Sequence, residues 1–539
     1  MGASHRRSGG VGDLIQRTLQ DREQARLGLQ ENLDGNRSRG ERNRLGQFAT
    51  PTQLASEVVN TGLAMLGDTV KQLSFMDPGF GTGSFFSALS QQTRASRVKR
   101  ALGFEIDPHY CGPAVELWSD TKLVLRNADF LMESPSRHGG PVDLIVCNPP
   151  YVRHHHIEST RKAELVARVR KELGLKASGL AGLYVYFLLL SHEWLNPGGV
   201  SVWLIPGEFM DVNYGRVLKE YLGTRVRLDR IHRFRPEDVQ FTDALVSSVV
   251  VWFRKAPVSP SHTVELTDGG TLTKPEASRR VPIAHLGSRE RWSTFFFAER
   301  ARRSSTLKLG DLFKIQRGIA TGANEFFILP ELVAAELPRE VLKPLLPPPR
   351  YLKTNEILAE PNGDPSISPR SFLLDVRLPI DKVRERYGVV ADYLESGASR
   401  FAARYLCRSR RQWYEQEVRA PAPLLCTYMG RSGKRGTPFR FIMNHSTAIA
   451  TNVYLMLYPR ARLVEACKKN PQLMRQLWQR LDVLAAELFS SLSRVYGGGL
   501  HKFEPTELGE LPVDSLSDLI DTRDWGTMNQ PDLFQAVQK

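Results

Sequence analysis

The amino-acid sequence predicts an α/β fold, an open and mostly parallel sheet with helices on both faces, followed by a second domain. Short apolar runs that end in Gly, Asp or Pro alternate with helical stretches from about residue 46 onward. This alternation is typical of parallel sheets. The chain has 539 residues, and a single core stops growing at roughly 250–300 residues. We therefore expect at least two domains.

The apolar runs place the individual elements. Buried strands are predicted at 73–77, 100–105, 142–148 and 198–206, with a third apolar run before Asn127. Helices are predicted at 54–66, 180–195 and 215–222. The run 244–255 is predicted as a late strand that closes the sheet. Because such sheets bind ligands at the carboxyl ends of their strands, we expect the functional site there.

Composition shifts predict the domain boundaries. Residues 1–45 form a polar, Arg-rich arm, either a solvated extension or a segment that contacts DNA or another partner. We assign 46–262 to the first domain, ending in the linker 255–262, and 263–304 to a connecting segment. Residues 305–539, richer in Arg, Pro and aromatics, form the second domain.

Charge and cysteine usage narrow the class of protein. The net charge of +15 favours a polyanionic partner, nucleic acid before a membrane surface. None of the five cysteines has CxxC spacing, so neither a zinc site nor a redox dithiol is indicated. The longest apolar run, 183–190, is too short to span a bilayer, and the N-terminus lacks the apolar core of a signal peptide. We expect a cytoplasmic protein without a membrane partner.

A glycine-rich segment follows the first predicted strand. In DPGFGTGSF (77–85), Gly79, Gly81 and Gly83 allow a tight turn and a close approach to a ligand. The segment lacks the Gly-Lys-Ser/Thr of a phosphate-binding P-loop. Asp77 ends the strand with a carboxylate, which suits a cationic amino-acid group better than a pyrophosphate.

The next two strand ends carry acidic residues as well. Glu105 in GFEID (103–107) is placed to accept both hydroxyls of a ribose, and Ile106 follows it. In NADF (127–130), Asp129 is placed to accept a hydrogen bond from an adenine amino group, with Phe130 packed on the ring. Three successive strand ends therefore predict a pocket for an adenosine with a polar tail.

The segment DLIVCNPPY (143–151) carries the most specific pattern. Pro149 and Pro150 fix φ and remove two backbone donors, giving a rigid turn. The Asn148 side-chain oxygen and the Pro149 carbonyl are then two acceptors aimed at one point. They can take both hydrogens of a planar amino group, which moves its nitrogen lone pair towards an electrophile. Tyr151 supplies an aromatic face for a base.

These motifs occur in an order that resembles a known family. GQFATP (46–51), DPGFGTGSF, GFEID, NADF and NPPY together resemble the gamma-class, Taq-type N6-adenine DNA methyltransferases of Type II restriction–modification systems. The resemblance covers about residues 46–256. It implies a Rossmann-like class I S-adenosylmethionine-dependent methyltransferase domain, with an α+β target-recognition domain after it. Ala49 departs from the pattern, because the family often has an aromatic there.

The resemblance also implies roles for individual residues. Gln47, Thr50 and Pro51 would help to close over the methionine part of S-adenosylmethionine. Phe241, just before the late strand, would stack on a flipped-out adenine opposite Tyr151. Enzymes that modify a base must first extrude it from the duplex. The partner is then double-stranded DNA, and a separate cognate endonuclease would share its target site. We expect a monomer.

Parts of the second domain resemble target-recognition domains of that family. The matching segments are 310–329, 404–416, 426–441 and 493–513, which mix Arg and Lys with aromatics and glycine. Such segments neutralise phosphates and reach base edges. The candidate DNA-binding residues are Arg317, Arg410, Arg411, Arg431, Lys434, Arg435, Gly498 and Lys502.

Several alternatives stay open from the sequence. An amine methyltransferase acting on RNA or on a protein glutamine fits the same turn, and so does a catalytically inactive DNA-binding specificity subunit. Asn148 favours adenine over N4 of cytosine, and the absence of a Pro-Cys dipeptide excludes C5-cytosine chemistry. A fused nuclease is disfavoured because the arm is short. We predict no metal site, since the adjacent histidines 154–156 have no suitably spaced partner.

Overall fold

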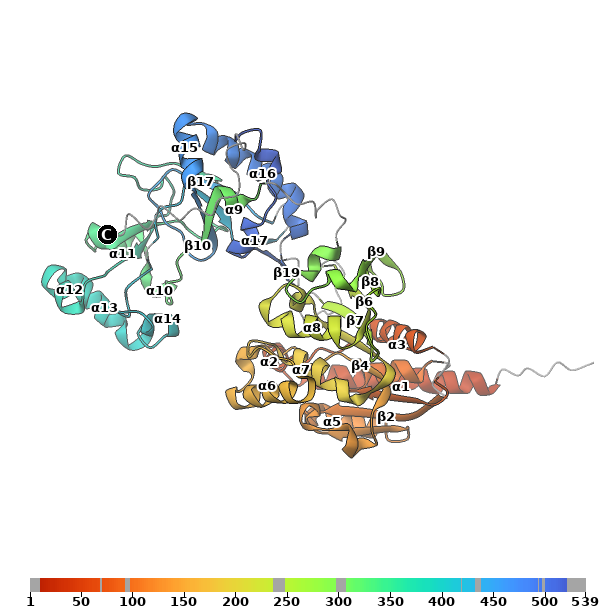
Figure 1. Ribbon diagram of the computed structural model, residues 1–539. Coiled ribbons are helices and arrows are strands. Elements are labelled where there is room, and N and C mark those ends of the chain that lie inside the picture. Colours follow the sequence, from red (N-terminus) through yellow and green to blue (C-terminus); the bar gives the residue numbers. More distant parts are fainter. Residues whose placement is uncertain are drawn as a thin grey trace, which may run out of the picture. The chain divides into compact units, whose positions relative to one another are not determined.

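The chain divides into two compact units, which Figure 1 shows. The computed structural model describes residues 10–67, 70–92, 97–235, 248–296, 307–417, 419–431, 438–492, 494–496 and 500–520. The first unit comprises residues 1–298 with 496–498, and the second comprises 299–495 with 499–539.

The first unit is built on a nine-stranded sheet with the order β3-β2-β1-β4-β5-β7-β6-β8-β9. Its strands are β1 (Leu73–Asp77), β2 (Val98–Glu105), β3 (Leu123–Asn127), β4 (Val142–Cys147), β5 (Leu195–Pro206), β6 (Arg227–Arg233), β7 (Ser248–Arg254), β8 (Thr263–Gly270) and β9 (Pro275–Pro282). The strands from β3 to β5 are all parallel, and β7 is antiparallel to both of its neighbours. This topology confirms the predicted Rossmann-like fold.

Helices cover both faces of this sheet. They are α3 (Thr52–Leu66), α4 (Ser84–Ser90), α5 (Pro108–Leu117), α6 (Ser159–Leu173), α7 (Leu183–Leu190) and α8 (Arg216–Thr224). Alternate residues of β5 enter two different cores, because successive strand side chains point to opposite faces. Val202 packs in a core with α3 and α4, whereas Trp203 packs in a core with α6, α7 and α8.

The parallel strands contain a switch point that positions the site. The chain runs from β1 to β2 and β3 on one side, and then crosses to β4 on the other side of β1. Such a reversal leaves a crevice at the carboxyl ends of the two central strands. Asp77 ends β1 and Asn148 directly follows β4. The two residues singled out from the sequence therefore lie at neighbouring strand ends.

Three expectations about the end of this unit are wrong. The strand predicted to close the sheet, β7, lies between β5 and β6, so it is internal. The residues 263–282, assigned to a connecting segment, form β8 and β9 and extend the sheet. The presumed linker 255–262 accordingly joins two strands of one sheet. The last strands of this unit join the sheet through backbone hydrogen bonds, which the pattern of apolar residues does not reveal.

The N-terminal arm is folded onto the first unit. It contains α1 (Gly10–Gly35) and α2 (Arg39–Leu45), and α1 packs against α4 and α5. Leu33 is 7% exposed and Arg26 is 1% exposed. The interpretation of the arm as a solvated extension is therefore wrong for its described part. The polar composition of the arm led to the wrong prediction, because the contacts that α1 buries are themselves largely polar.

The second unit is α+β. Its sheets have the orders β10-β18-β15-β17-β13, β11-β14-β12 and β16-β20-β19. The strands are β10 (Phe313–Arg317), β11 (Ile328–Pro330), β12 (Leu342–Leu345), β13 (Glu356–Ile357), β14 (Ser371–Leu374), β15 (Leu424–Thr427), β16 (Met429–Arg431), β17 (Phe441–Asn444), β18 (Tyr454–Pro459), β19 (Arg494–Tyr496) and β20 (Leu500–Lys502). The helices are α9 (Leu309–Leu312), α10 (Asn324–Phe327), α11 (Glu331–Ala334), α12 (Ile380–Arg386), α13 (Gly388–Phe401), α14 (Tyr405–Arg408), α15 (Ala461–Lys469), α16 (Leu473–Leu492) and α17 (Pro505–Gly509). No helix in the described part of the chain combines the length and apolar composition needed to cross a bilayer.

Candidate active site

A cavity of about 580 Å³ lies at the carboxyl ends of β1, β2, β3 and β4. This volume is within the range of roughly 300–1,000 Å³ that is usual for small-molecule sites. The predicted residues that line it are Gln47, Thr50, Asp77, Gly79, Gly81, Glu105, Ile106, Asp129, Phe130, Asn148 and Pro150. Pro51, Gly83, Pro149 and Tyr151 do not line it. Residues far apart in the sequence thus converge on one pocket.

The glycine-rich loop leaves β1 and forms one wall of this cavity. Gly79 donates its backbone N–H to Asp77 Oδ1 at 3.1 Å, which closes the first turn. Gly81 has φ of +55°, and no atom lies within 4 Å of the Cβ that a larger residue would add. Gly83 also has a positive φ, of 93°, but its added Cβ would lie 2.7 Å from the Phe80 ring. Gly81 therefore leaves open space beside the ligand cavity, whereas Gly83 permits close packing.

Asp77 is a buried acid in this wall, 1% exposed to solvent. Burial, helped to a smaller extent by the nearby Glu105 carboxylate, raises the pKa of its carboxyl to about 8 against the opposing effect of the hydrogen bond from Gly79. An ammonium or sulfonium group would stabilise the ionised form in this place. Asp77 thus has the electrostatics of a receptor for a cationic ligand group.

Glu105 forms the second acidic strand end. Its Oε2 accepts the Gly81 N–H at 2.9 Å, and its Oε1 accepts the Asp107 N–H at 2.9 Å. Burial raises the pKa of Glu105 above its ordinary value despite these two bonds. The adjacent Ile106 is 56% exposed although it lines the cavity. At this turn the carboxylate is suited to accept hydrogen bonds from a ribose, and the apolar side chain is suited to pack on a flat ring.

Asp129 and Phe130 differ partly from their expected roles. Asp129 Oδ1 accepts the Leu131 N–H at 3.1 Å, and Oδ2 forms an ion pair with Arg161 of α6. Arg161 also lines the cavity and was not anticipated, because nothing in its helix distinguishes it from other basic residues. Phe130 is 2% exposed and packs against Phe187, so only part of its ring is available to a ligand.

The Asn-Pro-Pro-Tyr turn after β4 is held by the segment that precedes α3. Asn148 Nδ2 donates to the Phe48 carbonyl at 2.9 Å and to Thr50 Oγ1 at 3.1 Å. Asn148 Oδ1 is buried and has no hydrogen-bond donor among the described residues. Buried polar atoms are normally paired, so an unpaired acceptor marks a place where a ligand donor fits. Because two hydrogen bonds already hold Nδ2, the end of the Asn148 amide that is available to a ligand is Oδ1.

The same two segments also meet through their backbones. The Tyr151 N–H donates to the Gly46 carbonyl at 3.2 Å. Gly46 has φ of +68°, and a Cβ there would lie 2.3 Å from the Tyr151 nitrogen. The Tyr151 ring is 8% exposed, and its hydroxyl donates to the Leu204 carbonyl of β5 at 3.1 Å. The centre of the Phe48 ring lies 5.8 Å from the centre of the Tyr151 ring, and Phe48 also lines the cavity. Phe48 was not predicted from the sequence.

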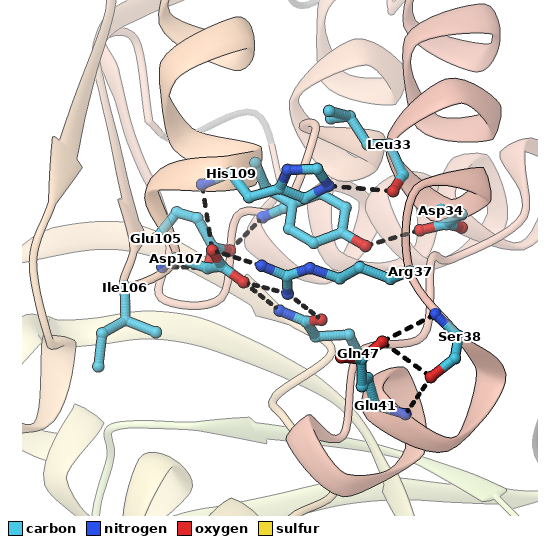
Figure 2. Close-up of polar contacts among 12 residues, drawn as sticks. Leu33, Asp34, Arg37, Ser38, Glu41, Gln47, Glu105, Ile106, Asp107 and His109 are labelled. Atoms are coloured by element: carbon cyan, nitrogen blue, oxygen red, sulfur yellow. Dashed lines mark hydrogen bonds and ion pairs between the residues drawn. The ribbon is translucent and has the colours of Figure 1, made fainter.

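A polar network at the C-terminal end of α1 closes another side of the cavity (Figure 2). Arg37 donates from Nη1 and Nη2 to the two carboxylate oxygens of Asp107. Gln47 Nε2 donates to Asp107 Oδ2 at 2.8 Å, and Gln47 Oε1 accepts from Arg37 at 3.0 Å. Gln47 is thus bound within the protein at the cavity wall. Arg37 and Asp107 were not predicted, although Asp107 followed by Pro108 is a typical helix start.

The predicted DNA-binding residues of the second unit fall in separate places. The Arg317 guanidinium carbon lies 3.9 Å from the centre of the Tyr428 ring, and Lys502 Nζ lies 5.0 Å from it. Arg431 is on β16, which pairs with the strand of Lys502. Arg410 donates to the Ala320 carbonyl, and Arg411 pairs with Glu415. Lys434, Arg435, Gly498 and the predicted stacking residue Phe241 lie outside the described residues.

The three consecutive histidines form a short turn, His154–His156, and His156 lines the cavity. Within the described ranges, no group of three or more His, Cys, Asp or Glu side chains is arranged to hold a metal ion.

Two family models and several known proteins are similar to this chain. The family model "Eco57I restriction-modification methylase" matches residues 115–240, and "Type II methyltransferase M.Eco57I, C-terminal domain" matches residues 293–533. Type II methyltransferase M.XamI of Xanthomonas campestris pv. amaranthicola is 28% identical over 494 residues, covering 88% of this chain and 86% of that protein. Type II methyltransferase M.AccI of Acinetobacter calcoaceticus is 26% identical over 489 residues, covering 87% of this chain and 85% of that protein.

A solved structure shows the same fold over most of the chain. The Type IIL restriction-modification enzyme MmeI, in complex with DNA, aligns with a TM-score of 0.52 and 12% sequence identity. The alignment covers 90% of this chain and 66% of the MmeI chain, so this chain spans about two thirds of MmeI.

Proposed function

We propose that this chain, a member of the Type II restriction–modification methyltransferases, methylates the N6 amino group of an adenine in double-stranded DNA, with S-adenosylmethionine as donor. The proposal is carried by one observation, the buried and unpaired Oδ1 of Asn148 in a turn beside the cavity. An unpaired acceptor whose amide nitrogen is already bound selects a ligand that donates, as an exocyclic amino group does.

The lining of the cavity offers a suitable partner for each part of this donor molecule. Asp77 would hold the cationic methionine part, and the open space at Gly81 lets the ligand approach the loop backbone. Glu105 would accept from the ribose hydroxyls, with Ile106 packing on the adenine ring. The Arg161 partner of Asp129 competes with the adenine amino group, so we propose that Asp129 acts through its remaining lone pairs.

The chemistry asked of the protein is mainly positioning. S-adenosylmethionine, when bound, supplies an electrophilic methyl group on a sulfonium. Asn148 Oδ1 and the Pro149 carbonyl accept the two amino hydrogens of the target adenine. This withdraws the nitrogen lone pair from the ring and directs it at the methyl carbon. Transfer of that methyl group would form the nitrogen–carbon bond and break the carbon–sulfur bond, with the surplus proton released to solvent. No strong base is needed, and preorganised acceptors lower the barrier.

The target adenine must leave the duplex to reach this turn. We propose that it stacks between Tyr151 and Phe241, since base–aromatic stacking is worth roughly 1–3 kcal/mol. Tyr151 is suited to a fixed platform because both its backbone nitrogen and its hydroxyl are bound. The second unit would read the DNA sequence, with Arg317 and Lys502 among its contacts. The biological role would be protection of host DNA from a separate cognate endonuclease.

The test is a methylation assay with the full chain, unmethylated plasmid DNA and methyl-labelled S-adenosylmethionine. The DNA is digested to nucleosides, and the labelled nucleoside is identified by chromatography and mass. Label in N6-methyladenine that the Asn148→Ala variant fails to produce supports the proposal. Label in N4-methylcytosine overturns the base assignment. Label absent from DNA, with the donor still bound, overturns the DNA substrate and directs the same assay to RNA and to protein glutamine.

A further inference from the structure

The turn that joins α1 to α2 contacts two motifs of the cavity at once. Arg37 binds Asp107 of the GFEID turn with two donors, and it binds Gln47 of the GQFATP segment. Gln47 in turn donates to the same Asp107 carboxylate. Figure 2 shows that these three side chains form a closed triangle in which Arg37 comes from the arm. The arm therefore joins two cavity walls that are about 60 residues apart in the chain.

Neighbouring contacts hold the arm in this position. The Tyr110 hydroxyl donates to Asp34 Oδ1 at 2.7 Å, and His109 Nε2 lies 3.0 Å from the Leu33 carbonyl. The Arg37 guanidinium also lies 5.5 Å from the Tyr110 ring centre. Asp34 and Gln30 of α1 line the cavity themselves. The arm is therefore part of the wall rather than an external support.

The positive charge of Arg37 also affects the two carboxylates at the GFEID turn, Glu105 and Asp107. The Asp107 carboxylate follows Glu105 by two residues and raises the pKa of Glu105, in addition to the larger effect of burial. Burial also acts to raise the pKa of Asp107, yet the hydrogen bond from Arg37 leaves it below its ordinary value. Without the guanidinium, the part-buried Asp107 carboxylate beside Glu105 would keep its hydrogen bonds from Gln47 and the His109 N–H but would lose the positive charge of Arg37. Uncompensated charges of this kind are costly in a protein interior.

We propose that Arg37 is a positioning residue for cofactor binding, which through Asp107 and Gln47 fixes the GFEID turn and the GQFATP segment around the ligand. The inference rests on the proposed function, because the ligand is the S-adenosylmethionine assigned above. It adds that the N-terminal arm, outside every motif of the sequence, is required for that site.

The test measures S-adenosylmethionine binding to the full chain by isothermal titration calorimetry, together with methylation kinetics. Arg37→Ala is expected to weaken binding by about tenfold or more, since it removes charge-assisted hydrogen bonds. The KM for S-adenosylmethionine should rise by a similar factor, whereas kcat at saturating donor and the KM for DNA should stay close to those of the wild type. Thermal unfolding of each variant checks that the chain is folded.

Two further variants separate positioning from a general loss of structure. Arg37→Lys keeps the charge but lacks the two-pronged geometry, so its affinity should lie between those of the wild type and Arg37→Ala. Adding Asp107→Asn to Arg37→Ala removes the carboxylate charge that Arg37 no longer compensates and keeps an acceptor for Gln47. We expect this double variant to bind S-adenosylmethionine more tightly than Arg37→Ala alone.

Arg22→Ala is the matched control. Arg22, in α1 of the same N-terminal arm, forms an ion pair with Asp120 at 2.6 Å, and neither residue lines the cavity. Its loss should leave S-adenosylmethionine affinity unchanged. Wild-type affinity in a folded Arg37→Ala variant, or an equal loss in Arg22→Ala, overturns the inference and leaves the proposed function standing. A wild-type protein that fails to bind S-adenosylmethionine overturns both.

Discussion

The side-chain nitrogen of Asn148 donates a 2.9 Å hydrogen bond to the backbone carbonyl of Phe48, exactly one hundred residues earlier in the chain. Thr50 Oγ1 accepts a second bond from the same nitrogen. An amide flipped by 180° would place its oxygen against the Phe48 carbonyl and leave that acceptor without a donor. The segment before α3 therefore determines that the turn after β4 presents the oxygen of the Asn148 amide, rather than its nitrogen, to a ligand.

Replacement of Asn148 by alanine should remove methyl transfer and retain donor binding. Loss of one preorganised polar group at a reacting centre costs about 100-fold or more in kcat. Asn148 is one of many cavity residues, so S-adenosylmethionine affinity should change by only a few-fold. Single-turnover methylation and calorimetric binding measure the two quantities separately. A variant that loses affinity and keeps its rate would contradict the assigned role.

Thr50 should act on the rate through Asn148. Thr50→Val removes the Oγ1 acceptor at nearly constant volume, and a single hydrogen bond lost from the amide predicts a kcat lower by about fivefold to tenfold. Thr50→Ser keeps the hydroxyl and serves as the control, with a rate near that of the wild type. Equal rates for the valine and serine variants would show that this bond does not orient the amide.

S-adenosylmethionine binding should depend on pH through Asp77. Burial raises the pKa of this carboxyl to about 8 in the free protein, so below that pH it is largely protonated. A bound cation favours the carboxylate, and binding must therefore release a proton. Affinity should rise with pH between about 6 and 7.5, by at most about tenfold per unit. The ligand's own amino group, with an ordinary pKa of about 7.7–8.0, limits measurements above this range.

Asp77→Asn provides the control for this titration. Its affinity should be weak and nearly independent of pH over the same interval. Calorimetry in buffers of different ionisation enthalpy counts the released protons directly. Because an acid with a raised folded-state pKa loses stability as pH rises towards that value, the free Asp77→Asn protein should also unfold at a higher temperature at pH 7.5. Proton release that persists in the variant would assign it to another group.

Alanine substitutions of Gly81 and Gly83, in the glycine-rich loop after β1, should have different effects. Gly83→Ala combines a positive φ with a Cβ contact of 2.7 Å to Phe80, which predicts destabilisation of about 2–4 kcal/mol. Gly81→Ala has the same backbone penalty of about 1–2 kcal/mol and open space for its methyl group, so its main defect should be weaker S-adenosylmethionine binding. Chemical denaturation and binding titration distinguish the two. Equal stability losses would contradict this division.

DNA affinity should respond to Arg317 and Lys502, which both lie over Tyr428. If each neutralises a phosphate, alanine substitution weakens DNA binding and lowers the slope of log K against log salt by about 1 per residue. S-adenosylmethionine binding should be unaffected. The control is Arg384→Ala in the same unit. It removes an exposed arginine of α12 that pairs with Asp392 and Glu395 of α13. An unchanged salt slope in the Arg317 and Lys502 variants would remove these residues from the DNA contact.

The strand ends of the first unit could be predicted because their sequence signals are local. An apolar run followed by Asp77, Glu105 or Asn148 specifies both a strand and the residue at its carboxyl end, and the parallel topology then brings these ends together. The same logic failed for β8 and β9. Residues 275–280 of β9 alternate little in polarity, and β8 joins the sheet by pairing in parallel with β6, which is not its neighbour in the sequence.

The contribution of α1 could not be predicted for a different physical reason. Its buried contacts are polar: Arg26 donates to Glu23, Thr82 and Ser84, and the Thr82 hydroxyl donates to Gln30. A polar helix that satisfies its hydrogen bonds internally has the same composition as one that faces water. Only partners fixed in three dimensions distinguish the two, and this is why Arg37 carried no signal in the sequence.

Every described residue that lines the cofactor cavity, from Gln30 to Phe187, belongs to the first unit. The second unit has hydrophobic clusters of its own, and none of its described residues is part of that lining. If the second unit reads the DNA sequence, as proposed, substitutions that alter which bases are recognised can accumulate there without changing the lining of this cavity. Such a division would allow the recognition domain to be exchanged, in evolution or by protein engineering, while the first unit stays constant.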